Sequence, residues 1–191
     1  MTSQEVIQLF RDAGALLDGH FRYTSGRHGR QFLQAARVLQ YPDITETLCK
    51  AIAAAFSRED VALVVGPATG GIVLAYETAR HLRCRAAFSE KDDQGGMAVK
   101  RGVALAPGTR TLVVEDIVTT GGSVKKTVAH LRQRGADVVG VAVLIDRSRS
   151  ETTLDCRFVP LARLGMDSWE PDECPLCKKG LPVIEPDDLL G

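Results

Sequence analysis

The sequence has no excess of charge of either sign and no apolar run long enough to cross a membrane. Its 24 Lys and Arg residues balance 24 Asp and Glu residues, so the formal net charge is 0. A neutral chain argues against binding nucleic acid or an anionic membrane over a large surface, although a local basic site stays compatible with it. The longest strongly apolar run, residues 138–145, is far shorter than the roughly 20 residues that a membrane helix needs. We therefore expect neither a nucleic acid nor a membrane among the partners.

Targeting signals, repeats and low-complexity segments are also missing from the sequence. The first residues, MTSQEVIQLF, have no basic stretch followed by an apolar one, so no secretory signal is expected. Five cysteines are an odd number in a chain of 191 residues, which is long enough to fold without disulfides. Reduced thiols and a cytoplasmic location fit this usage. With 45% hydrophobic and 25% charged residues, the composition is that of a globular domain.

Hydrophobic periodicity predicts that strands and helices alternate along most of the chain. Short, almost wholly apolar segments are typical of buried parallel strands, and they occur at residues 61–65, 111–114 and 138–145. Apolar residues at helical spacing predict helices over about residues 3–19, 42–57, 72–81 and 124–134. The predicted fold class is α/β, with an open, mainly parallel sheet flanked by helices and a small N-terminal α+β cap. This single domain divides into a cap over about residues 1–40, a core over about 41–165 and an irregular tail over about 166–191.

The most informative segment is the run VVEDIVTTGGS at residues 113–123. It places two adjacent carboxylates, Glu115 and Asp116, at the end of a predicted strand, where they suit the neighbouring hydroxyls of a ribose. The turn after them carries hydroxyl residues and glycines at a predicted helix N-terminus, in the order Thr119, Thr120, Gly121, Gly122 and Ser123. Backbone N–H groups at such a turn bind a phosphate monoester, helped by the helix dipole. The order of groups therefore fits a ribose 5-phosphate.

A simpler interpretation of this segment involves no ligand at all. In that alternative the two carboxylates only cap the following helix, and the glycines only make a tight turn. The segment is not a P-loop, because no Lys precedes Ser123, and it lacks the G-x-G-x-x-G pattern of dinucleotide-binding folds. The other glycine-rich turn, residues 66–71, is by itself equally compatible with a plain strand-to-helix connection.

The run at residues 113–123 resembles the signature with which type I phosphoribosyltransferases bind 5-phosphoribosyl 1-diphosphate (PRPP). The resemblance extends over nearly the whole chain to the orotate-using branch of that family, through residues 33–40, 66–72, 88–102 and 174–177. It implies the type I phosphoribosyltransferase fold, Mg²⁺ as cofactor and a homodimer. It also implies transfer of the 5-phosphoribosyl group from PRPP to orotate, giving orotidine 5′-monophosphate and diphosphate in pyrimidine biosynthesis. The PRPP-binding residues that it implies are Glu115, Asp116, Ile117, Val118, Thr119, Thr120, Gly121, Gly122, Ser123, Ala68, Thr69, Gly70, Lys91, Lys100 and Arg101.

The resemblance further implies that Thr119 and Arg147 contact orotate. Arg147 follows the predicted strand at residues 138–145, so we expect it at the carboxyl edge of the sheet, where open α/β sheets bind ligands. A guanidinium is the natural partner of a planar carboxylate or of a pair of imide oxygens. Taken alone, Arg147 is more typical of a surface arginine paired with Asp146 or Glu151.

The cap departs from the family pattern. Residues 25–30 read SGRHGR where the family often has SGRxSP, and Thr24 stands where many orotate enzymes have Lys. These departures keep open a purine or an orotate-like base as the substrate. A PRPP-binding regulator without catalysis is a less favoured alternative, because 191 neutral residues leave little room for a nucleic-acid-binding region.

The catalytic loop that the resemblance implies, residues 90–96, is short and acidic, and such a run is otherwise typical of a solvated turn. Lys91 alone matches a loop lysine, and Lys100 or Arg101 would add positive charge. Breaking the C1–O bond develops positive charge on the ribose and negative charge on the diphosphate, so the protein is expected to position reactants and stabilise charge. Catalytic roles are assigned to Lys91 and Asp116. Mg²⁺ is expected on the diphosphate and ribose oxygens, largely through water.

No residue is assigned to a metal site of the protein itself. The pair Cys174-x-x-Cys177 is half of a structural zinc site, but Cys156 is the only other thiol nearby in sequence. The four histidines are scattered along the chain. Packing of the tail around Trp169, on the core or on a partner subunit, is the favoured interpretation, with zinc and a redox disulfide as alternatives.

Overall fold

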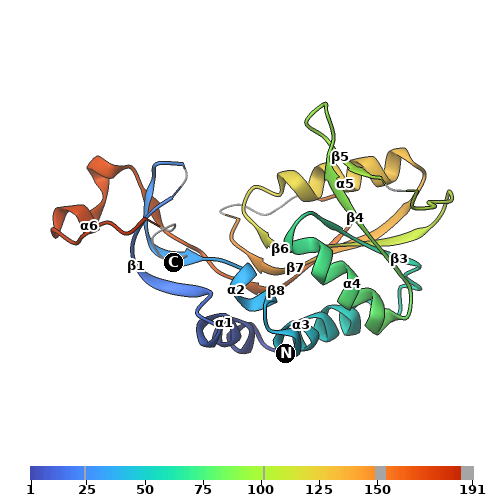
Figure 1. The fold of residues 1–191 in the computed structure, drawn as a ribbon, viewed down its shortest axis with the longest axis horizontal. Helices are drawn as coiled ribbons and strands as arrows, with labels where there is room; N and C mark the ends of the chain where they lie inside the picture. The colour runs from blue at the N-terminus through green and yellow to red at the C-terminus, as the bar shows by residue number, and fades with distance from the viewer. Residues whose placement is uncertain (24, 101, 149–153, 186–191) are drawn as a thin grey trace.

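The core of the protein is a six-stranded, mainly parallel sheet (Figure 1). The computed structural model describes residues 1–23, 25–100, 102–148 and 154–185. The strands are β3 (Leu63–Pro67), β4 (Arg85–Lys91), β5 (Met97–Val99), β6 (Arg110–Val118), β7 (Asp137–Asp146) and β8 (Arg157–Arg163). They follow the order β5-β4-β3-β6-β7-β8, in which β5 runs antiparallel to β4 and the other neighbours pair in parallel. The predicted open, mainly parallel sheet is confirmed.

Helices cover both faces of this sheet. Successive residues of each strand point to opposite sides, so strands that are apolar throughout give the sheet two apolar faces that must be buried. The helices are α1 (Ser3–Asp12), α2 (Ala36–Leu39), α3 (Pro42–Ala55), α4 (Gly70–Leu82) and α5 (Gly122–Gln133). Leu112 and Val114 of β6 belong to a buried cluster that also contains side chains of α1, α3 and α4. Val113 belongs to a second buried cluster, with Val128 and Leu131 of α5. Strand β6 therefore lies between α4 on one side and α5 on the other.

Helix α1 is shorter than its hydrophobic pattern predicts. Thr2 and Glu5 form a capping box, in which each backbone N–H donates to the side chain of the other residue. The helix ends at Asp12 instead of near Gly19, because the chain turns at Gly14, whose φ is 63°. The apolar residues that continue the helical spacing after this turn belong to a strand.

The N-terminal segment and the tail together build a second, small sheet. It consists of β1 (Leu16–Arg22), β2 (His28–Leu33) and β9 (Ser168–Trp169), paired antiparallel with β2 in the middle. A short 3-10 helix (Pro171–Glu173) and helix α6 (Pro175–Lys178) follow β9. The N-terminal α+β cap is confirmed, but the tail expected to be irregular supplies one of its strands. Figure 1 shows this sheet as a lobe beside the core, with α6 at its outer end.

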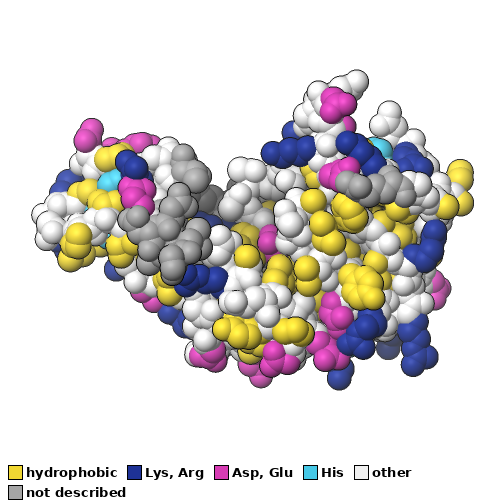
Figure 2. Space-filling model, viewed as in Figure 1, with side chains coloured by type: hydrophobic (Ala, Val, Ile, Leu, Met, Phe, Trp, Pro, Cys, Tyr) yellow, Lys and Arg dark blue, Asp and Glu magenta, His cyan; other side chains and the backbone are white. Residues whose placement is uncertain are grey.

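The surface carries charges of both signs, as the zero net charge leads one to expect. On the face shown in Figure 2, Lys and Arg side chains are interspersed with Asp and Glu, and the outline narrows between the cap lobe and the core. In the described ranges, no helix combines the length and the apolar character needed to cross a membrane.

Candidate active site

Strand β6 carries both candidate carboxylates, and it is longer than the sequence pattern predicts. It continues to Val118 instead of ending near residue 114, so Glu115 and Asp116 are strand residues that point to opposite faces. Glu115 lines a cavity of about 270 Å³ on the side of α5. Asp116 lies against Gly70 at the start of α4, where an added Cβ would overlap its carboxylate. The two acids thus contact different helices, yet they also contact each other, because the N–H of Asp116 donates to Glu115 Oε1 at 3.2 Å.

Burial perturbs the protonation of both acids. Burial, together with the neighbouring Asp116, raises the pKa of Glu115 to about 8. Burial also raises the pKa of Asp116, while the N–H of Ile117, which donates to Asp116 Oδ1 at 2.6 Å, favours its ionised form. Burial therefore favours the protonated form of Glu115 at neutral pH, and the two acids titrate as an interacting pair.

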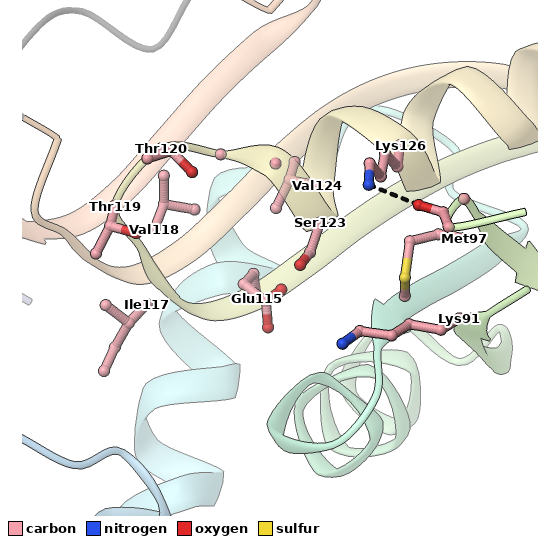
Figure 3. A pocket seen from close by; sticks show the side chains of 14 residues that line it. Lys91, Met97, Glu115, Ile117, Val118, Thr119, Thr120, Ser123, Val124 and Lys126 are labelled. Atoms are coloured by element: carbon pink, nitrogen blue, oxygen red, sulfur yellow. Dashed lines mark hydrogen bonds between the residues drawn. The ribbon is translucent and has the colours of Figure 1, made fainter. Parts of the chain in front are cut away.

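The loop after β6 supplies hydroxyls and N–H groups to the cavity that Glu115 lines. The whole stretch of residues 117–123 contributes to the lining, including Thr119, Thr120 and Ser123, which Figure 3 labels. Gly121 is the N-cap of α5 with a φ of 73°, a left-handed conformation that suits glycine. The first N–H groups of a helix have no partner within the helix, and the dipole gives that end a partial positive charge. The loop is therefore built to bind an anion.

A β-hairpin forms another wall of this cavity. The turn between β4 and β5, residues 92–96, is held by Asp92, whose Oδ1 accepts hydrogen bonds from the N–H groups of Gln94 and Gly96. Lys91, the last residue of β4, lines the cavity, and Figure 3 shows its side chain extending into it. The segment expected to be a catalytic loop is thus a hairpin that brings one lysine to the site.

The predicted cation Lys100 lies beside the hairpin strand and not in this cavity. Lys100 Nζ donates to the carbonyl oxygen of Lys91 at 3.1 Å and lies 3.9 Å from Glu90 Oε1, so it braces the hairpin. Lys100 is not among the described residues that line the cavity. Arg101 lies outside the described residues.

The second glycine-rich turn leads from β3 into α4 and lies on the Asp116 side of β6. Gly66 is packed so tightly that an added Cβ would overlap the backbone at the start of α4. Thr69 is the N-cap of the 13-residue helix α4, and the peptide bond between Ala68 and Thr69 is cis. This turn therefore offers a second helix N-terminus, next to Asp116 and apart from the cavity that Glu115 lines.

Arg147 lies directly after β7, at the carboxyl edge of the sheet as predicted. Its backbone N–H donates to the carbonyl of Val118 at 2.7 Å, which fixes it beside the anion-binding loop. Its Nε is buried and has no hydrogen-bond partner among the described residues. Burial lowers the pKa of Arg147, and Tyr23 of the cap opposes this shift. Such an unpaired guanidinium nitrogen is what an anionic ligand would satisfy.

One of the two alternative partners of Arg147, Asp146, is engaged by other residues. Asp146 is buried and accepts hydrogen bonds from Ser148 N at 2.9 Å and Ser148 Oγ at 2.6 Å, and Arg163 lies 3.8 Å from it. Asp146 is thus engaged by residues other than Arg147 in the described part of the chain. Glu151, the other partner considered, lies outside the described residues.

The chain matches known proteins along most of its length. Residues 38–161 match the family described as "Phosphoribosyl transferase domain". An orotate phosphoribosyltransferase from Pelotomaculum thermopropionicum is 45% identical over 186 residues, which cover 97% of each chain. One from Desulforamulus reducens is 44% identical with the same coverage. This chain belongs to the orotate phosphoribosyltransferase family.

Solved structures agree with this family membership. The orotate phosphoribosyltransferase of Aeropyrum pernix superposes with a TM-score of 0.70 at 26% identity, covering 83% of this chain and 93% of that one. The adenine phosphoribosyltransferase of Rhodothermus marinus reaches a TM-score of 0.65 at 20% identity, covering 84% of this chain and 99% of that one. The second likeness shows that the fold is shared between phosphoribosyltransferases named for different bases.

Lys126 also lines the cavity, and the sequence analysis did not identify it as a site residue. It lies on α5 and lines the cavity, and its Nζ donates to the carbonyl of Gly95 in the hairpin turn at 2.6 Å (Figure 3). The sequence did contain a signal for this role. Lys126 lies one helical turn after Gly122, and residues four apart on a helix share a face. Lys126 thus links the anion-binding helix to the hairpin opposite.

The raised pKa of Glu115 predicts a pH-dependent stability. Between about pH 5 and 8 the native state keeps the Glu115 proton that the unfolded state has lost, so the native state binds more protons and stability falls as pH rises. We expect the melting temperature of the ligand-free protein to fall over this window, and to fall less in Glu115→Gln. Calorimetry from pH 5 to about 8.5 measures both slopes, with the exposed Asp93→Asn as control. Equal slopes in the wild type and Glu115→Gln would contradict a protonated Glu115.

Proposed function

We propose that this protein transfers the 5-phosphoribosyl group from PRPP to orotate, forming orotidine 5′-monophosphate and releasing diphosphate in pyrimidine biosynthesis. Its relatives named orotate phosphoribosyltransferase, 45% and 44% identical over nearly the full chain, support this activity. The observation that carries the choice of base is the Nε of Arg147, which is buried beside the anion-binding loop with no partner in the described part of the chain. The orotate carboxylate would pair with this guanidinium, and Thr119 would contact the base from the cavity rim.

The proposed binding mode for PRPP uses the two faces of β6. The 5-phosphate would accept hydrogen bonds from the loop at residues 117–123, whose hydroxyls and N–H groups line the cavity. Glu115 and Asp116 would hold the ribose hydroxyls, since a protonated acid can donate and an ionised one can accept. The diphosphate would meet the turn containing Ala68, Thr69 and Gly70, at the N-terminus of α4.

Charge stabilisation is the main catalytic task in the proposed reaction. As the C1–O bond breaks, the ribose gains positive charge, which the carboxylate of Asp116 would stabilise. Lys91 would neutralise the negative charge that develops on the diphosphate, and Lys126 holds the hairpin that carries Lys91 against α5. Lys100 and Arg101 remain predicted PRPP contacts. Lys100 would act through the hairpin, because its Nζ donates to the carbonyl of Lys91.

The acidic pair also fits the Mg²⁺ ion that the family resemblance implies. Carboxylate oxygens are the ligands that this hard cation prefers, and Glu115 and Asp116 offer two neighbouring carboxyl groups at the end of β6. Both residues would hold the ion, directly or through water. When bound, the ion supplies positive charge to the diphosphate oxygens.

Turnover with a panel of bases tests the proposed function. Purified protein should consume orotate in the presence of PRPP and Mg²⁺ much faster than adenine, guanine, xanthine or uracil. The readout is the release of diphosphate together with the new nucleotide, separated by chromatography. Turnover of a purine at the rate of orotate would refute the assignment of the base, and PRPP binding without any turnover would indicate a regulator.

The homodimer and the cytoplasmic location implied by the sequence stay predictions. Sedimentation velocity of the full chain would measure the oligomeric state. A dimer is expected, with the hairpin of one subunit a candidate to complete the site of the other. A monomer with full activity would exclude a site shared between subunits.

A further inference from the structure

Four residues from opposite ends of the chain meet in the cap lobe, away from the cavity of β6. They are His20 of β1, His28 of β2, and Cys174 and Cys177 at helix α6. One potential ligand atom of each lies within 4.8 Å of all the others. His20, His28 and Cys174 are buried, with exposed fractions of 3%, 7% and 0%. The histidines that look scattered in the sequence are therefore brought together with the cysteine pair.

The distances among these atoms fit coordination of one common centre. His20 Nε2 lies 3.0 Å from His28 Nδ1, 3.5 Å from Cys174 Sγ and 3.6 Å from Cys177 Sγ, and His28 Nδ1 lies 3.2 Å from Cys177 Sγ. A tetrahedral zinc ion with ordinary bond lengths separates two nitrogen ligands by about 3.3 Å and a nitrogen from a sulfur by about 3.6 Å. The observed separations are within a few tenths of an ångström of these values.

Ordinary hydrogen bonding does not explain this arrangement. His20 Nδ1 lies 2.9 Å from the carbonyl of Leu181 and must donate to it, because a carbonyl can only accept. In a neutral imidazole the Nε2 atom of His20 then has one lone pair, yet three possible donors or ligands surround it. One lone pair cannot accept three hydrogen bonds, but four ligand atoms around a cation approach one another in this way. A backbone acceptor that orients the far nitrogen of a histidine is also typical of metal ligands.

The charge balance favours a divalent cation bound by thiolates. Two cysteine thiolates and two neutral imidazoles around Zn²⁺ have zero total charge, so the complete site can be buried at low electrostatic cost.

We propose that His20, His28, Cys174 and Cys177 bind one Zn²⁺ ion in a structural site of the Cys₂His₂ type. All four positions are filled by protein ligands, which is typical of structural and not of catalytic zinc. The site cross-links the β1–β2 hairpin to the tail, whose only ladder with β2 among the described residues is the two-residue strand β9. The ion would therefore hold the tail on the cap.

Local backbone geometry prepares the four ligands. His20 lies where the pairing of β1 with β2 shifts register, between Asp18 and Phe21. This irregularity allows His20 and its neighbour Phe21 to be buried together, although adjacent strand residues normally face opposite sides. Cys174 is the N-cap of α6 and Cys177 lies one turn later, so both sulfurs are presented from the same short helix.

Metal analysis of the full chain, purified without chelator, is the direct test. We expect about one zinc ion per chain in the wild type, and loss of nearly all of it in Cys174→Ser/Cys177→Ser and in His28→Ala. The matched control is Cys156→Ser, which removes a half-buried thiol that packs on the α5 side of the core and should keep the zinc. Wild-type protein without stoichiometric zinc, or zinc retained by the double serine variant, would overturn the proposal.

Two further measurements on the wild type do not depend on whether a variant folds. Adding a strong chelator should lower the melting temperature and make two additional thiols reactive, and restoring zinc should reverse both effects. Replacing zinc by Co²⁺ should give the visible absorption of a tetrahedral site with thiolate ligands. A disulfide between Cys174 and Cys177, seen as the loss of two hydrogens by mass spectrometry, would overturn the proposal. The proposal would also be overturned if the accessibility of His20, His28, Cys174 and Cys177 did not change when zinc or chelator is added.

Discussion

Replacing Arg147 by glutamine is expected to raise the KM for orotate about 100-fold, with little change in the KM for PRPP. A hydrogen bond to a charged group contributes about 1.5–3 kcal/mol when the partner would otherwise be buried unpaired, and 2.7 kcal/mol is about a factor of 100. The buried Nε of Arg147 has no partner among the described residues, so the ligand is the group whose binding depends on it. Initial rates at varied orotate and fixed, saturating PRPP measure this effect.

Arg163→Gln is the matched control for this prediction. Arg163 is the last residue of β8, at the same edge of the sheet, and lies 3.8 Å from Asp146, but its side chain is 60% exposed. The Arg163→Gln substitution removes the same charge without changing the proposed base site. The KM of this variant for orotate should therefore stay near that of the wild type. If both variants raise the KM for orotate equally, Arg147 acts only through the positive charge that it adds to this edge of the sheet. That result would contradict a direct contact between Arg147 and orotate.

Replacing Lys91 by alanine is expected to lower kcat by about 100-fold or more, since removing one group that stabilises transition-state charge typically costs 10²–10³-fold. Lys91 is the hairpin lysine whose side chain extends into the cavity, where it would meet the diphosphate as negative charge develops (Figure 3). The KM for PRPP should change much less than kcat, because the charge is largest in the transition state. Steady-state kinetics at several PRPP concentrations separate the two parameters.

The control for Lys91 is Lys125→Ala, an exposed lysine on α5 outside the cavity lining, which should keep the wild-type kcat. Lys100→Ala should lower kcat less than Lys91→Ala, because Lys100 Nζ binds the carbonyl of Lys91 and braces the hairpin. A kcat for Lys91→Ala close to that of the wild type would show that the hairpin does not supply the charge for the leaving diphosphate.

Much of the fold was predictable because it depends on short stretches of sequence. The buried strands β3, β6 and β7 appear as apolar runs, and Gly135, with a φ of 83°, follows α5 where the end of that helix was predicted. Errors occur where a local pattern meets a tertiary constraint. The helical spacing up to Gly19 is genuine in the sequence, but pairing with β2 draws the residues after Gly14 into β1.

The candidate site divides in the same way. The order of carboxylates, hydroxyls and glycines at residues 115–123 indicates a phosphate and a diol from the sequence alone, and all but Asp116 line the cavity. Sequence could not say that Glu115 and Asp116 face opposite sides of β6, since the predicted strand ended before them. It could not show Lys126 closing on the hairpin either, because that contact joins segments 31 residues apart.

The sequence by itself determined the alternation of strands and helices and the chemical character of the loop after β6, because these follow from near neighbours along the chain. Tertiary structure alone decided the burial of Arg147 Nε without a partner among the described residues, and the meeting of His20 and His28 with Cys174 and Cys177. Both depend on which distant segments pack together and in what register. In the cap, one shift in strand pairing and the return of the tail bring four separated side chains to one point.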